Sequence, residues 1–143
     1  MNVSTVYFGE VTVDSSKIIQ FENGLPGFND AKEFVLIDIE GNPTFQVLQS
    51  IGKEDLAFVV TNPFLIYSNY EFDADDQALE KLKLETNEHL VVKCILTLEK
   101  PFEQSTINLK APIIINAQTR QAKQIVLKED KFHTKHPIQQ GGE

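Results

Sequence analysis

The chain has no tryptophan, one cysteine, one methionine and no long hydrophobic run in its 143 residues. The single cysteine, Cys94, excludes an intrachain disulfide framework and agrees with a reducing compartment. Because it lacks an apolar span and the pattern of a signal peptide, we expect a cytoplasmic protein that does not bind membranes. The absence of tryptophan disfavours a carbohydrate-binding module, although Tyr7, Tyr67 and Tyr70 leave that class open.

Basic residues are also scarce, with 13 lysines and arginines against 21 acidic residues and a formal net charge of -8. Such a surface repels phosphate backbones, so direct nucleic-acid binding is disfavoured. The charge is uneven, because residues 1–99 hold 17 acidic and 6 basic side chains, whereas residues 100–143 hold 4 and 7. The body of the protein is therefore expected to attract basic partners.

A Gly-Leu-Pro-Gly corner between two aromatic residues is the strongest local feature of the chain. Gly24 and Gly27 adopt positive φ at little cost, and Pro26 fixes its own φ, so the chain must reverse here. The flanking rings of Phe21 and Phe28 are both predicted to point into a hydrophobic core. The corner lacks the spacing of a phosphate-binding loop, and we interpret it as structural.

Short apolar runs alternate with turn residues through most of the chain, which predicts an all-β, mainly antiparallel fold. We expect a small β-barrel-like or sandwich domain over residues 1–132, with one short helix of about three turns near residues 74–84. Residues 133–143 lack periodicity and are expected to form a flexible tail. Strands or hairpins are predicted at 3–13, 18–21, 34–39, 45–51, 56–60, 89–98, 105–110, 113–117 and 124–128, and the 89–98 strand, apolar on both faces, is predicted to be central.

Few side chains could carry catalysis or bind a metal. His89 opens a predicted strand, where a structural role is expected, and His133 and His136 lie in the predicted tail. No cysteine lies near these two histidines, which argues against a zinc site. Cys94 lies on the apolar face of its strand and is expected to be a buried, inert thiol. No catalytic, cofactor or metal site is therefore predicted.

An acidic cluster surrounds the start of the predicted helix. It lacks the glycine and glutamate that a calcium-binding EF-hand loop requires at its sixth and twelfth positions. Two interpretations remain, a solvated helix start that complements the helix dipole and a surface that binds a basic partner. The cluster consists of Glu71, Asp73, Asp75, Asp76 and Glu80.

Four segments of the chain together resemble the flagellar assembly factor FliW family. They are Ile19–Phe28, 45–50 together with 58–63, 92–98, and 107–116 continued to 124–127. Their order and spacing run through nearly the whole chain and are more specific than any one segment. Within them, the residues interpreted as a structural motif are Gly24, Pro26, Gly27, Phe28, Asn62, Pro63, Asn108, Pro112 and Asn116.

The resemblance implies a β-barrel-like protein without catalysis. We also expect no cofactor and a monomer when the protein is free of its partners. The resemblance also implies two alternative partners, flagellin and the translational repressor CsrA, with allosteric antagonism of the repressor and hence control of flagellin translation. The acidic cluster is then a candidate repressor-facing surface. Candidate apolar anchors for either partner, with core packing as the alternative role, are Phe64, Leu65, Ile66 and Phe102.

Two other function classes are compatible with the sequence. One is a small β-scaffold enzyme that uses carboxylates, and the other is a ligand-binding module. A protein-binding regulator is expected to lack a deep polar pocket, so the presence or absence of such a pocket is the structural feature that bears on the choice.

Overall fold

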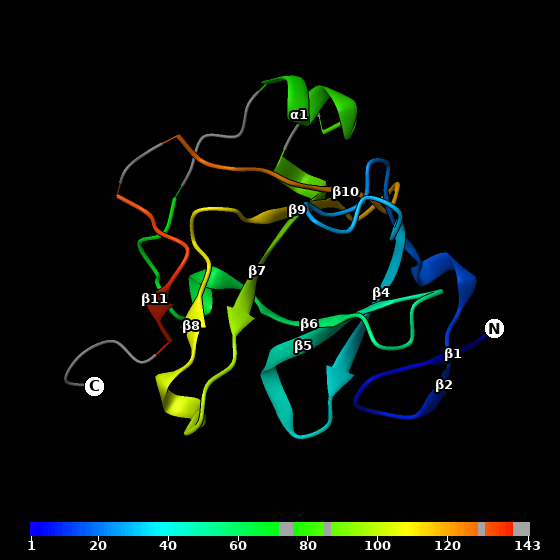
Figure 1. The fold of residues 1–143 in the computed structure, drawn as a ribbon. Helices are drawn as coiled ribbons and strands as arrows, with labels where there is room; N and C mark the ends of the chain where they lie inside the picture. Colours follow the sequence, from blue (N-terminus) through cyan, green and yellow to red (C-terminus); the bar gives the residue numbers. More distant parts are fainter. Residues whose placement is uncertain (72–75, 85–86, 129–130, 139–143) are drawn as a thin grey trace.

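The computed structural model describes residues 1–71, 76–84, 87–128 and 131–138, and its main feature is a closed β-barrel (Figure 1). Along the barrel wall, each strand is antiparallel to its neighbours, except that β3 and β10 run parallel. This closure confirms the predicted fold class. In their order around the barrel, the strands are β7 (Leu90–Thr97), β6 (Ala57–Thr61), β5 (Asn42–Ser50), β4 (Glu33–Ile39), β3 (Ile19–Phe21), β10 (Gln121–Gln124) and β9 (Ile113–Asn116), which pairs again with β7.

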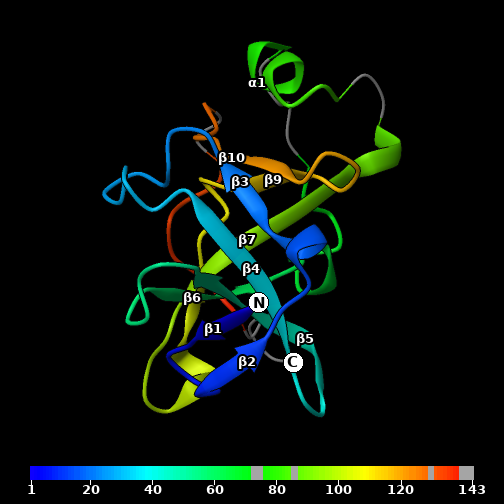
Figure 2. The same ribbon diagram turned by 90° about the vertical axis from the view of Figure 1, so that its right-hand side faces the viewer.

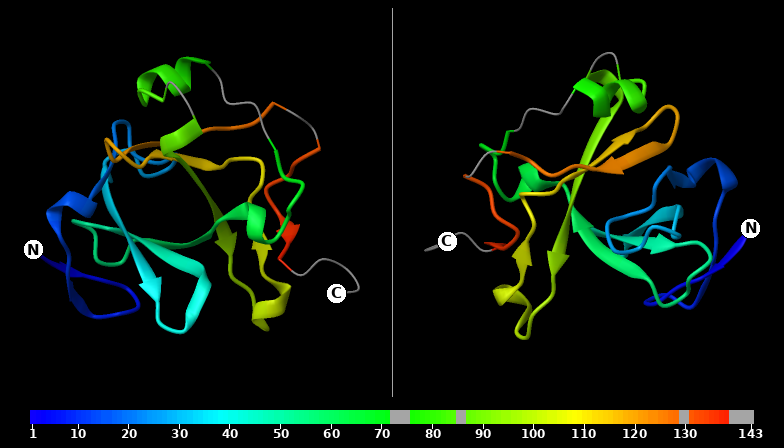
Figure 3. Two further views of the ribbon diagram at one scale, coloured as in Figure 1. Left: turned by 180° about the vertical axis from the view of Figure 1, so that it is seen from behind. Right: turned by 45° about the horizontal axis from the view of Figure 1, so that its top comes forward.

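Two additions flank the barrel on opposite sides (Figure 3). A hairpin of β1 (Asn2–Ser4) and β2 (Glu10–Thr12) packs Val3 and Val13 against Val35 of β4 (Figure 2). On the other side, β8 (Thr106–Ile107) pairs with the end of β7, and β11 (His136–Pro137) pairs with β8. The helical elements are α1 (Asp76–Lys81) and the 3-10 turns η1 (Ser15–Lys17), η2 (Pro63–Leu65), η3 (Asn87–His89) and η4 (Phe102–Gln104).

Strand β7 is buried on both faces, as its apolar pattern predicts. Val92 and Cys94 pack in a core outside the barrel wall, and Leu96 on the same face is buried. That outer core lies between β7, β8, β9 and α1. Val91 and Ile95 alternate with them and pack against the core inside the barrel. The strand pairs with β6 along one edge and with β9 and β8 along the other, which confirms its central position.

The Gly-Leu-Pro-Gly corner closes one end of the inner core. Phe21 is 1% exposed and packs edge to face on Phe34, with ring centroids 5.3 Å apart. Leu25 is also buried, whereas Phe28 is 40% exposed and rests its ring against Phe58. The prediction that both flanking rings point inward is correct for Phe21 and wrong for Phe28. The reason is the tight turn from Leu25 to Phe28, which commits Leu25 to the core and leaves Phe28 at the rim.

The last barrel hairpin is displaced along the sequence from its predicted place. The predicted strand 124–128 is wrong, because β10 occupies Gln121–Gln124 and pairs there with β9. Asn116 fixes the intervening turn, since its side-chain oxygen accepts hydrogen bonds from the backbone of Gln118 and Thr119. The chain after β10 runs beside residues 110–112, to which Ile125 and Leu127 donate backbone hydrogen bonds.

Helix α1 is six residues long, shorter than the three turns predicted. Its inward stripe is confirmed, since Ala78 and Leu82 are buried and Leu79 packs against the outer core. The helix ends early because Lys83 adopts a left-handed φ of 57°. The backbone N–H groups of Lys83 and Leu84 then bond back to Glu80 and Leu79, a pattern that terminates helices.

The segment from residue 131 to 138 lies along β8 and the outer core. Phe132 and Ile138 pack against that core, and His136 and Pro137 form β11. The predicted tail, 133–143, therefore begins within a strand-paired segment, and its last five residues lie outside the described residues. Its flexibility stays a prediction. Among the described residues, no helix has the length and apolar character needed to cross a membrane.

Candidate functional site

The acidic cluster lies partly on α1, which sits at one end of the molecule above β9 and β10 (Figures 1 and 2). Glu71 and Glu80 are exposed, and Asp76 is the first residue of the helix. Asp73 and Asp75 lie outside the described residues. The helix packs its apolar side on the outer core, and its exposed residues include Gln77, Glu80 and Lys81. That exposed side is available to a partner.

The proposed apolar anchors separate into exposed and packed side chains. Phe64 is 40% exposed and Leu65 is 62% exposed, next to each other in η2. The side chain of Asn62 holds this turn by accepting a hydrogen bond from the backbone of Phe64 at 2.9 Å. Ile66 instead packs against the outer core, which is the alternative role given above. Only the first two therefore present apolar surface at this turn.

Phe102 presents a second exposed apolar surface, at the opposite end of β7 from α1. It is 44% exposed and packs edge to face on Phe45 of β5, with ring centroids 5.4 Å apart. Leu98, which follows β7, is also 44% exposed. Sequence patterning missed Phe45 and Leu98, because each belongs to a predicted strand and periodicity does not show which end of a strand leaves the core.

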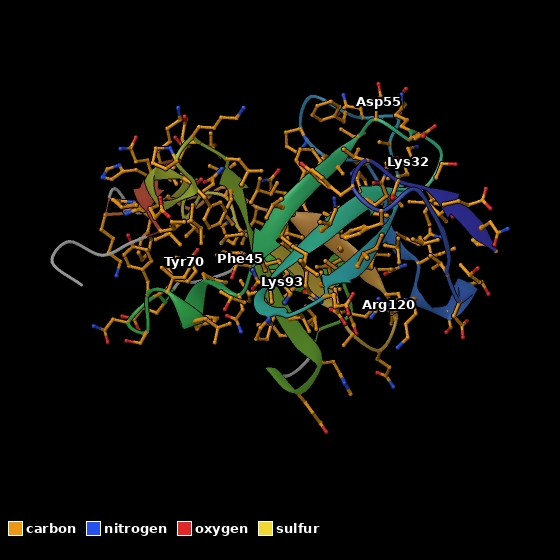
Figure 4. All side chains as sticks on the ribbon, turned by 90° about the horizontal axis from the view of Figure 1, so that it is seen from below. Lys32, Phe45, Asp55, Tyr70, Lys93 and Arg120 are labelled. Carbon is orange, nitrogen blue, oxygen red and sulfur yellow. The ribbon has the colours of Figure 1, made fainter. Side chains whose placement is uncertain are left out.

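A charged residue, Lys93, lies between Val91 and Ile95 on the barrel-facing side of β7 (Figure 4). Its side chain is partly buried, and this burial lowers the pKa of its ammonium group, while the nearby carboxylate of Asp38 acts in the opposite direction. Asp38 in turn accepts a hydrogen bond from the side-chain amide of Gln46 at 2.7 Å. These groups form a polar end to the inner core that sequence patterning did not single out.

The positions of Cys94 and His89 do not suit a catalytic role. Cys94 is fully buried, and burial raises the pKa of its thiol to about 12, so the nucleophilic thiolate is disfavoured. His89 lies at the end of η3 and not at the start of the strand as predicted, and its carbonyl accepts a backbone hydrogen bond from Ala117. The predictions of a buried thiol and a structural histidine agree with these positions.

His133 and His136 are stacked at the start of β11, with ring centroids 5.4 Å apart. The Nε2 atom of His136 accepts a hydrogen bond from the backbone N–H of His133 at 2.8 Å, and its ring contacts Tyr67. Burial, and secondarily the charge of His133, lower the pKa of His136 below its usual value. Protonation of Nε2 would remove the acceptor of that hydrogen bond.

Acidification is therefore expected to loosen this segment. Because the pKa of His136 is lower in the folded state than in the unfolded state, the unfolded state takes up more protons as the pH falls through about 6.5. The midpoint temperature of thermal unfolding should decrease when the pH is lowered from about 7.5 to about 5.5. A His136→Gln variant keeps a hydrogen-bond acceptor, so its midpoint temperature should decrease less over the same pH range. Equal losses in both proteins would contradict this role for His136.

A cavity of about 660 Å³ opens where β3 and β10 meet the end of α1. Its described lining includes three lysines, Lys81, Lys83 and Lys123, and one carboxylate, Glu22, and has no histidine, cysteine, serine, threonine or tyrosine. The expectation concerned a deep polar pocket, and this open cavity, whose lining is polar by residue type, leaves the ligand-binding module open beside a regulator. The described lining lacks the paired nucleophile and base typical of a hydrolase.

Three asparagines of the predicted structural motif hold turns with their side chains. Asn62 bonds to η2, Asn108 accepts from the backbone of Lys110 and Ala111, and Asn116 accepts in the turn before β10. Asn116 also donates its side-chain amide to the carbonyl of Leu82 at 2.7 Å and is 2% exposed. Pro63 and Pro112 are buried, whereas Pro26 is exposed at the corner. This geometry is consistent with a structural role for these positions.

Comparison with known proteins gives consistent matches along the whole chain. A family model described as "FliW protein" matches residues 2–138. Proteins named "Flagellar assembly factor FliW" from Bacillus velezensis and Bacillus subtilis are 49% and 44% identical, over 96% and 100% of this chain and 96% and 99% of theirs. A crystal structure titled as that of the flagellar assembly factor FliW superposes with a TM-score of 0.92 at 38% identity and covers 96% of both chains.

Proposed function

The chain belongs to the FliW family, and from this premise we propose that it is a flagellar assembly factor that works by binding other proteins. The observation that carries the proposal is the family match over residues 2–138 together with relatives named as flagellar assembly factors. We propose flagellin and a CsrA-type translational repressor as alternative partners. The protein would act in the cytoplasm, where translation occurs, without making or breaking a covalent bond.

The charge distribution supports repressor binding. A repressor that binds RNA must present basic surface, and a protein with a net charge of -8 both attracts that surface and repels the RNA phosphates beside it. Glu80 places exposed negative charge on α1, and Glu71 places it on the segment that precedes the helix. We propose that this acidic surface faces the repressor and that control of flagellin translation follows from its binding.

The exposed apolar groups supply anchors for a partner. Phe64 and Leu65 lie together in η2, and the ring of Phe102 packs edge to face on Phe45. Rigid, partly exposed aromatic rings lose little conformational freedom when they are covered, which favours them as interface anchors. We propose that one of the two partners, flagellin or the repressor, covers these groups.

Reversing two charges tests the acidic surface. A variant carrying Glu71→Lys and Glu80→Lys is expected to bind the CsrA-type repressor of the same bacterium roughly tenfold more weakly, because two attractions near the interface become repulsions. The loss should shrink as salt rises, since exposed charges are screened. Isothermal titration calorimetry at low and high salt measures both effects.

A matched variant controls for net charge alone. Glu10→Lys together with Glu40→Lys makes the same change at two exposed positions away from α1 and should leave repressor affinity within a factor of about two. If both double variants weaken binding equally, the repressor responds to net charge and α1 is not its contact surface. If purified flagellin and the repressor both fail to bind the unmodified protein, the proposed function is wrong.

A further inference from the structure

The cavity beside the Gly-Leu-Pro-Gly corner has a charge opposite to that of the whole protein. Three lysines and a single glutamate line it in a chain with a net charge of -8. None of Lys81, Lys83 and Lys123 has a carboxylate partner among the described residues, where the one ion pair joins Lys53 to Asp30. Such uncompensated positive charge in a concave site favours an anionic ligand.

Three side-chain amides of the lining are suited to a peptide. Asn23, Asn29 and Gln121 line the cavity, and their side chains make no hydrogen bond within the part of the chain that the structure describes. Each carboxamide offers both a donor and an acceptor, which matches the alternating N–H and C=O groups of a peptide backbone. An inorganic anion would use only the donors.

An open strand edge adds to the peptide character of the site. The pairing of β10 with β3 covers only Gln121 and Ala122, because β3 ends at Phe21, whereas β10 continues to Gln124. Lys123 pairs with Ile114 of β9, so the backbone groups left without a strand partner on the β3 side, among the described strands, are those of Gln124. Both residues line the cavity. An exposed strand edge inside a pocket is a common mode of recognition for an extended peptide.

Lys83 stands where helix termination favours glycine. It follows α1 with a φ of 57°, and the backbone around it bonds in the pattern that usually has glycine at this position. Its neighbour Leu82 is held against the barrel by the side chain of Asn116. The left-handed position therefore places a lysine, with its backbone fixed, at the edge of the cavity.

We propose that this cavity binds an acidic peptide segment of a partner protein, with carboxylates on the three lysines and the peptide backbone on the amides and the β10 edge. A nucleic acid fits less well, because its regular phosphates would meet Glu22 and the negative body of the protein. The cavity is basic, whereas the surface proposed to face the repressor is acidic. The two sites would therefore bind partner segments of opposite charge. Binding at the cavity does not depend on whether flagellin or a repressor binds elsewhere.

The test is an NMR titration of the full chain with capped hexaglutamate. Backbone amide signals of Gly24, Lys83 and Lys123 are expected to shift with hexaglutamate and to stay unchanged with capped hexaglutamine. A variant with Lys81→Gln, Lys83→Gln and Lys123→Gln should bind hexaglutamate at least tenfold more weakly. A variant with Lys100→Gln, Lys128→Gln and Lys135→Gln, which loses the same charge outside the lining, should bind as the unmodified protein does.

Two further measurements separate the alternatives. Lys83→Gly should weaken hexaglutamate binding without lowering the midpoint of thermal unfolding, which would rule out loss of the fold as the cause. Inorganic phosphate should bind more weakly than hexaglutamate. Equal binding of phosphate, equal loss in both triple variants, or shifts spread over the surface in place of the cavity would each overturn the proposal.

Discussion

Replacement of Gly24 with alanine is expected to destabilise the protein by about 3 kcal/mol or more. Gly24 has a φ of 68°, and a Cβ atom built on it would lie 2.5 Å from the carbonyl oxygen of Phe28 and 2.7 Å from the backbone of Asn29. Both contacts are to backbone, so they can be relieved only if the corner itself moves. That corner carries Leu25 into the inner core, and its displacement would loosen the barrel end. Equilibrium unfolding in urea measures the loss.

Gly27 provides the matched control within the same corner. Its φ is 86°, yet a Cβ atom there would meet nothing within 4 Å. Gly27→Ala should therefore cost only the intrinsic penalty of a left-handed residue, about 1–2 kcal/mol. If the two variants lose the same stability, positive φ alone explains the glycines and the close approach of Phe28 to Gly24 has no energetic weight.

Removal of the Asn116 side chain is expected to cost about 3 kcal/mol. Its amide donates to Leu82 of the helix end, while its oxygen accepts from Gln118 and Thr119 in the turn before β10. The residue is 2% exposed, so in Asn116→Ala the carbonyl of Leu82 loses a buried hydrogen bond that water cannot readily replace, and the turn before β10 loses two part-buried bonds. Denaturation curves give the change in stability, and the amide signals of Leu82 and Lys83 should move in the same variant.

Asn62 is the control for this prediction, because its side chain also accepts from a backbone N–H two residues later but does so at an exposed site. Asn62→Ala should cost about 1 kcal/mol, the usual value for a lost cap. A loss in Asn116→Ala no greater than this would mean that the bond to Leu82 does not hold the end of α1 against the barrel.

Sequence patterns predicted the turns and strands that depend on residues close together in the chain. Gly24 and Gly27 permit the positive φ of the corner. Alternation of β-branched and polar residues predicts the strands. The two apolar faces of β7 predicted its central place, because a strand with Val92 in one core and Val91 packed against the other must be covered on both sides. The buried position of Cys94 follows from the same pattern.

Features that depend on the path of the chain were predicted poorly. Phe28 has the large apolar side chain typical of a core residue, but the turn that buries Leu25 leaves Phe28 at the rim of the inner core. The start of β10 was misplaced because Gln121 and Lys123 are polar, and their strand state comes from pairing with β9 and β3. Local propensity is weak at such positions, and tertiary pairing overrides it.

The sequence by itself determined an acidic, mostly β protein with a rigid glycine-proline corner and a family pattern along its length. Only the tertiary structure decided that β3 and β10 run side by side and that Lys81, Lys83 and Lys123 line one cavity. The physical reason is that turn chemistry and periodicity act over a few neighbouring residues. Barrel closure instead joins segments about a hundred residues apart, and their meeting depends on which edges remain unpaired.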